Sequence, residues 1–175
     1  MASWTLGVPG ELNPEQRAIA EGLAAILERL NPPHLDVTGT SVVTDTNGFH
    51  VTLQHNTRPE LEVVVAASGD GEIVVSYGVE HEHFRSEDAG VGRVWPFPSN
   101  DHVEATLTLV ECLLTGRVEL HVWKRPLGIR THSYWINEEG QPELFLRGGT
   151  FGPYLGWSRT PAIHRFDFTR PGPSL

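Results

Sequence analysis

The chain has 175 residues, a length that suits one ordinary domain and that can bury a core without disulfides or metals. Hydrophobic residues make up 39% of it and charged residues 20%, which excludes an intrinsically disordered chain. The formal net charge of -9 favours solubility, disfavours nucleic-acid phosphates as a partner and would attract a basic one.

Two further features bear on the compartment of the protein. No run of residues approaches the ~20 apolar residues that a membrane helix needs, and the first residues lack the basic and apolar regions of a secretory signal. Cys112 is the single cysteine, so no internal disulfide can form. The sequence therefore predicts a cytoplasmic protein that makes no contact with a membrane.

The first predicted element is an amphipathic helix that follows a loose leader at residues 1–12. Asn13 and Pro14 match a helix N-cap followed by proline at the first helical position, and the prolines at 32–33 end the helix. Apolar residues recur between these limits at helical spacing, at Ile19, Leu23, Ile26, Leu27 and Leu30.

Three strands are predicted next, joined by tight turns. Residues 49–53 alternate between apolar and polar side chains, residues 61–67 are rich in β-branched side chains, and residues 73–77 form a returning strand. Asn47-Gly48 predicts a tight turn before the first of these strands, and residues 68–71 predict a turn between the second and the third. The pattern predicts an antiparallel meander.

The second half of the chain repeats the order of helix and then strands. Residues 85–99 have no periodicity, which predicts a loop. A helix follows, because Asp101 and Glu104 resemble a capping box at its start and Gly116 is a plausible residue for its end. Alternation then predicts strands at 118–122, 131–136 and 143–146, and an edge strand or an extended wrap at 163–168.

This order of elements predicts the fold class. Because the strands cluster between two helices, we expect an α+β fold with a mainly antiparallel sheet and two helices packed on one face. The sequence shows no internal repeat and no shift in composition, so we expect a single domain at residues 13–170, followed by a tail at 171–175.

The most unusual segment is Glu80-His81-Glu82-His83. If the preceding strand continues through it, His81 and His83 face one side of the sheet and Glu80 and Glu82 face the other. Two histidines on one strand face can bind zinc or another transition metal, although the spacing selects no third ligand. A metal-binding protein or a metal-dependent enzyme that uses His81 and His83 is therefore one alternative, while no cofactor is predicted.

Signatures of catalysis are missing from the sequence. It contains no G-x-S-x-G elbow, no phosphate-binding loop followed by lysine, no H-E-x-x-H and no C-x-x-C pair. Cys112 lies beside the apolar arc of the second predicted helix and is expected to be a buried small hydrophobe. The sequence therefore favours a protein without enzymatic activity, while a metal-dependent enzyme that uses His81 and His83 stays the alternative.

A strand that ends in residues 73–78 is followed by Glu80-His81-Glu82-His83-Phe84, by a second helix and by a strand at residues 119–124. Over residues 48–136 this arrangement resembles small immunity-type proteins of bacterial polymorphic toxin systems. The resemblance implies a cytosolic protein that binds and neutralises a cognate toxin, with no reaction and no obligatory cofactor.

The predicted partner-binding surface consists of Glu80, His81, Glu82 and His83 together with Trp95. Its carboxylates are expected to pair with basic residues of a toxin domain, and the tryptophan to act as an anchor. A third alternative is a structural or assembly subunit, which an exposed apolar sheet edge would indicate.

Overall fold

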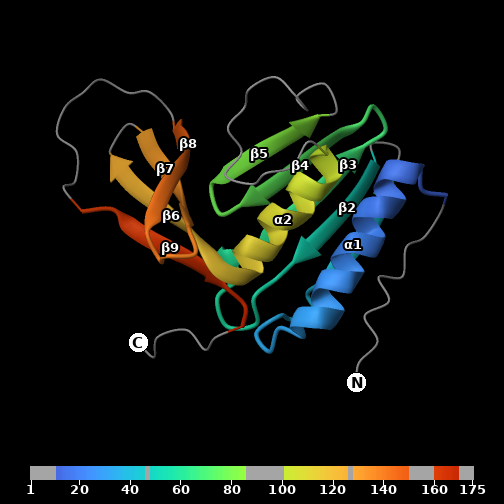
Figure 1. Ribbon diagram of the computed structural model, residues 1–175, viewed down its shortest axis with the longest axis horizontal. Helices are drawn as coiled ribbons and strands as arrows, with labels where there is room; N and C mark the ends of the chain where they lie inside the picture. The colour runs from blue at the N-terminus through green and yellow to red at the C-terminus, as the bar shows by residue number, and fades with distance from the viewer. Residues whose placement is uncertain (1–10, 46–47, 86–100, 126–127, 150–159, 170–175) are drawn as a thin grey trace.

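A computed structural model describes residues 11–45, 48–85, 101–125, 128–149 and 160–169. The strands form two antiparallel sheets, one ordered β1-β2-β3-β4-β5 and the other β8-β7-β6-β9 (Figure 1). The elements are α1 Pro14–Leu30, β1 Ser41–Asp45, β2 Gly48–Leu53, the 3-10 helix η1 Pro59–Leu61, β3 Val63–Ser68, β4 Glu72–Tyr77, β5 Glu80–Arg85, α2 His102–Leu114, β6 Thr115–Arg125, β7 Gly128–Ile136, β8 Pro142–Gly149 and β9 Ala162–Asp167.

Helix α1 begins and ends where its capping residues predict. The side chain of Asn13 accepts a hydrogen bond from the Gln16 backbone N at 2.8 Å, and the Gln16 side chain accepts one from the Asn13 backbone N at 3.1 Å. Asn31 adopts a left-handed conformation with φ 39° and ends the helix. The predicted apolar stripe is confirmed, since Leu23 and Leu27 are fully buried.

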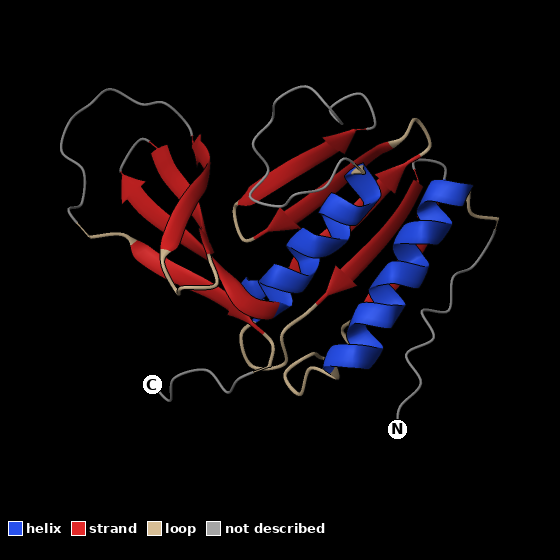
Figure 2. Cartoon of the chain, viewed as in Figure 1, coloured by secondary structure: helices blue, strands red, loops and turns tan. Residues whose placement is uncertain are grey.

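Helix α2 leads into a strand without an intervening loop. Asp101 Oδ1 accepts hydrogen bonds from the backbone N of Val103 at 2.7 Å and of Glu104 at 3.1 Å, which confirms the predicted start of the helix. Gly116 has φ 74°, a left-handed conformation that lets the chain leave the helix and enter β6 at once. Both helices lie on the same face of the five-stranded sheet (Figure 2).

The α+β class is confirmed, but the strands divide into two sheets, where we expected one. The strand through Tyr77 also does not continue into the histidine segment. Gly78, with φ 61°, reverses the chain, and Glu80 pairs with Tyr77 at the start of β5. As a result β5 is a separate edge strand, although the predicted alternation of its side chains still holds.

The two sheets meet at the turn between β4 and β5. Tyr77 is fully buried, and its hydroxyl donates a hydrogen bond to Ser133 Oγ of β7 at 3.1 Å. Its ring also packs edge-on against Phe166 of β9, with 5.8 Å between the ring centroids. The buried side chains of both sheets consequently belong to one hydrophobic core.

The segment predicted as an edge strand or a wrap is an edge strand, β9, which pairs with β6. Beyond it, the Phe168 backbone N donates a hydrogen bond to the Leu114 carbonyl at 2.8 Å, and the Phe168 carbonyl accepts one from the His34 backbone N at 3.2 Å. These bonds tie the last described residues to the end of α2 and to the loop after α1. Of the two described helices, neither has the length and apolar composition to cross a membrane.

A buried histidine lies next to this junction. His55 is 2% exposed and stacks on His34 with 5.5 Å between ring centroids, while Phe168 lies 5.1 Å from it on another side. Burial lowers the pKa of His55 below its usual value, and the nearby positive charges of His34 and Arg58 lower it further. His55 is therefore neutral in the folded protein at neutral pH.

We expect Leu23→Ala to lower the free energy of unfolding by about 2–5 kcal/mol, because Leu23 is fully buried under α1 and its truncation leaves a cavity. Urea denaturation monitored by circular dichroism measures this change. Glu28→Ala on the exposed side of the same helix is the control and should change stability by less than about 0.5 kcal/mol. Equal effects of the two substitutions would contradict the placement of α1.

We also expect the free energy of unfolding to fall as the pH drops below about 6.5, because the unfolded chain then protonates His55 while the folded chain resists protonation. The stability is fully present above that pH and is lost progressively as the pH approaches the lowered pKa of the folded state. Denaturation midpoints between about pH 5 and 8 measure the slope. His55→Gln should give a shallower slope, and an unchanged slope would count against this role.

Candidate functional site

The predicted partner-binding residues of β5 divide between its two faces. Glu82 is 8% exposed and points with Phe84 to the inner face, whereas His81 is exposed and His83 half-buried on the outer face. Glu80 is half-buried on the inner face. Trp95 lies outside the residues that the structure describes. The structure therefore brings His81 and His83 together on the outer face and places the two carboxylates on the inner face.

The inner carboxylates lie at the junction between the sheets. Thr131 Oγ1 of β7 donates a hydrogen bond to Glu80 Oε1, and the Glu80 carboxylate occupies the space that a Cβ on Gly148 of β8 would need. Burial raises the pKa of Tyr77, and the negative charges of Glu82 and Glu80 raise it further. Because Glu82 is buried, its carboxylate lies out of reach of a partner at the surface.

The outer histidines belong to a small charged cluster. The rings of His81 and His83 pack edge to face with 5.0 Å between their centroids, and His83 Nδ1 lies 2.8 Å from Glu72 Oε1. Arg85 Nε donates to the same oxygen at 2.8 Å. Hydrogen bonds from His83 and then from Arg85 lower the pKa of Glu72. The cluster therefore keeps a carboxylate ionised beside the two histidines.

A third metal ligand does not join these histidines in the part of the chain that the structure describes. Within it, no three histidine, cysteine, aspartate or glutamate side chains lie close enough together to hold a metal ion. Cys112 is buried, as expected, and burial raises the pKa of its thiol to about 11. At neutral pH this thiol is protonated and shielded from solvent, which does not suit a nucleophile.

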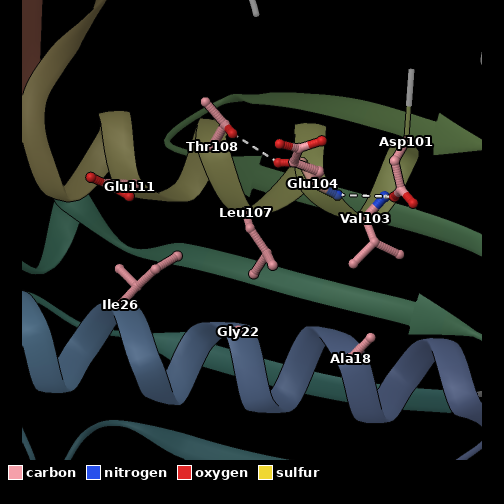
Figure 3. A pocket seen from close by; sticks show the side chains of 9 residues that line it. All are labelled: Ala18, Gly22, Ile26, Asp101, Val103, Glu104, Leu107, Thr108 and Glu111. Carbon is pink, nitrogen blue, oxygen red and sulfur yellow. Dashed lines mark hydrogen bonds between the residues drawn. The ribbon is translucent and has the colours of Figure 1, made fainter. Parts of the chain in front are cut away.

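A groove of about 420 Å³ lies between α1 and α2 (Figure 3). Its apolar part consists of Ala18 and Ile26 of α1 and Val103 and Leu107 of α2. Leu107 extends toward α1 above Gly22, where a Cβ would lie only 2.3 Å from Leu107 Cδ1. The missing side chain at Gly22 therefore allows the close approach of Leu107, and apolar surface remains accessible between the helices.

The α2 side of the groove is acidic. Asp101, Glu104 and Glu111 line it along the length of the helix. Glu111 Oε2 accepts a hydrogen bond at 2.5 Å from Arg29 Nη2, so that an ion pair joins the two helices. Asp101 also caps α2 through its hydrogen bond with the Val103 backbone N. The groove thus combines an apolar floor with three carboxylates on one side, an arrangement that can receive apolar and basic side chains together.

Sequence reasoning missed this groove. The sequence predicts a broad apolar arc on α2, and only part of that arc, including Leu109 and Leu113, is fully buried. Val103 and Leu107 face α1 and stay partly exposed. Two features of the sequence could have indicated the groove: the breadth of the apolar arc on α2 and the small residues at positions 18 and 22 of α1.

The described residues define an α+β protein with a groove between its two α-helices. Comparisons of the chain with models of protein families, with curated proteins and with solved structures found no match. The resemblance to immunity-type proteins of toxin systems therefore stays a prediction from the sequence.

The bond between Tyr77 and Ser133 should stabilise the junction that orients β5. Removing either hydroxyl alone leaves its buried partner without that bond, so we expect Tyr77→Phe and Ser133→Ala each to lower the free energy of unfolding by about 1–2 kcal/mol. The double variant should lower the free energy of unfolding by less than the sum of the two single changes, and the difference, which is the interaction energy of the pair, should be about 1 kcal/mol. Thermal or urea unfolding of the four proteins measures it, and strict additivity would contradict a direct bond.

Proposed function

We propose that this chain is a protein-binding module that acts as an immunity-like protein and neutralises a cognate bacterial toxin. The observation that carries the proposal is the groove between α1 and α2, with Leu107 in its floor and Asp101, Glu104 and Glu111 along one side. Such a groove suits a segment of the toxin that presents an apolar side chain flanked by lysine or arginine.

Charge supports the same proposal. The net charge of -9 attracts a basic protein over long distances and raises the rate of encounter. Toxins that act on nucleic acids need basic clefts for the phosphate backbone. An acidic protein that docks at such a cleft would exclude the nucleic acid by occupying its binding surface and by presenting like charge to it.

The outward residues of β5 form a second predicted contact. His81 and His83 lie on the helix-free face of the five-stranded sheet, at a different surface from the groove. In this proposal they extend the interface or select the partner, while Glu80 and Glu82 support β5 from within. The protein acts in the cytosol, and a free buried thiol at Cys112 is compatible with that compartment.

The first experiment is isothermal titration calorimetry of the purified protein against the product of the neighbouring gene. We expect a one-to-one complex with a dissociation constant well below about 1 μM, and this dissociation constant should rise with added salt. The absence of a complex at micromolar concentration, or stoichiometric zinc, iron or manganese in protein purified without an affinity tag, would count heavily against the proposal.

Charge reversal in the groove locates the interface. Glu104→Lys should weaken the complex by at least about tenfold, because it replaces attraction with repulsion toward a basic partner. Glu139→Lys makes the same change in net charge on an exposed turn between β7 and β8 and should weaken binding by less than about threefold. Glu104→Gln removes the charge without reversing it, so its dissociation constant should lie between those of the two lysine variants. Equal effects of the two lysine variants would exclude the groove as the binding site.

A further inference from the structure

The four-stranded sheet has an inner face toward the core and a second face, here called the outer face. Leu120 of β6, which is 1% exposed, marks the inner face. Side chains alternate along a strand, and directly paired residues share a face. The register of the two central strands therefore places His121 and Trp123 of β6 and His132 and Tyr134 of β7 on the outer face.

These four rings form an ordered cluster. His121 and Tyr134 lie 4.5 Å apart between centroids, and Trp123 and His132 lie 4.9 Å apart. Arg130 has its guanidinium 5.8 Å from the centroid of the Trp123 ring and donates from Nε to His132 Nε2 at 3.0 Å. Because these contacts already fix the side chains, binding at this surface would lose little conformational entropy.

Positive charge exceeds negative charge across the same cluster. The register places Arg147 of β8 beside His132 and Arg165 of β9 beside Glu119 on this face, in addition to Arg130. Arg165 Nε donates to Glu119 Oε1 at 3.0 Å, and Asp167, two residues further along β9, lies on the same face, so two carboxylates accompany three arginines among the described residues. On a chain with a net charge of -9, this surface has the opposite sign to the molecule as a whole.

Exposed apolar side chains flank the cluster on both edge strands. Ile163 of β9, paired with His121, is 55% exposed, and Leu144 of β8, paired with Tyr134, is 38% exposed. Tryptophan, tyrosine and arginine are the residues that contribute most to protein interfaces. The face thus combines aromatic, cationic and apolar groups in the manner of a binding surface.

We propose that the outer face of the four-stranded sheet binds an extended protein segment that carries carboxylates and apolar side chains. The carboxylates pair with Arg147 and the neighbouring arginines, and the apolar side chains cover Ile163 and Leu144. This inference goes beyond the toxin-binding groove, since it concerns another surface and a partner segment of the opposite charge.

A nucleic acid fits this face less well. Its rings pack edge-on or tilted against one another, and His132 is only 9% exposed, so they offer little open surface for stacking of bases. The net charge of -9 also repels a long polyanion while it tolerates a short acidic segment in contact with the arginines.

The test is a titration of the full chain with a short synthetic peptide of alternating glutamate and leucine, followed by NMR of the tryptophan indoles and by fluorescence anisotropy. We expect salt-dependent binding with a dissociation constant below about 1 mM, and no binding of the matched peptide with lysine in place of glutamate. Arg147→Glu and Ile163→Ser should each weaken binding by at least about fivefold.

Matched controls use exposed residues elsewhere on the molecule. Arg17→Glu on α1 and Val37→Ser before β1 make the same chemical changes and should leave peptide binding within about twofold. No binding of the acidic peptide, equal losses in the control variants, tighter binding of an oligouridylate, or concentration-dependent dimers that Ile163→Ser abolishes would each overturn the proposal. Arg147→Glu should leave toxin binding at the groove unchanged, so failure of one proposal is distinguishable from failure of the other.

Discussion

The C-terminal end of α2 is the point on which the arrangement of both sheets depends. Leu114 is fully buried there, and its carbonyl accepts a hydrogen bond from the Phe168 backbone N. Gly116 then turns the chain directly into β6, which pairs with strands on both of its sides. A helix that joins a strand without a loop has few orientations available, so the packing of α2 on the five-stranded sheet also sets the direction of the four-stranded sheet.

This arrangement separates two surfaces of opposite charge. The groove between the helices carries carboxylates from one side of α2, while the outer face of the four-stranded sheet carries Arg130, Arg147 and Arg165. Both surfaces keep apolar groups within reach of solvent, at Leu107 in the first and at Ile163 in the second. Under the two proposals the protein would hold two partner segments at once, because neither surface uses residues of the other.

The sequence predicted the elements well where the signal is local. The caps at Asn13 and Asp101 and the alternation at 49–53 each depend on neighbouring residues, and the structure has α1, α2 and β2 there. The division into two sheets depends on pairing between residues far apart, such as Leu120 with His164, which periodicity does not encode. Both proposed surfaces were missed for the same reason, since each is assembled from elements that lie far apart in the sequence.

The position of β9 has a consequence for synthesis of the protein. Phe166 and Phe168 are fully buried in the common core, yet Phe166 lies in β9, the last strand among the described residues, and Phe168 directly follows it. Until they emerge, β6 has an unpaired edge and the core has two large vacancies, so a nascent chain that already contains both helices cannot complete its native packing. Folding of this domain can therefore be completed only after β9 and Phe168 have been synthesised.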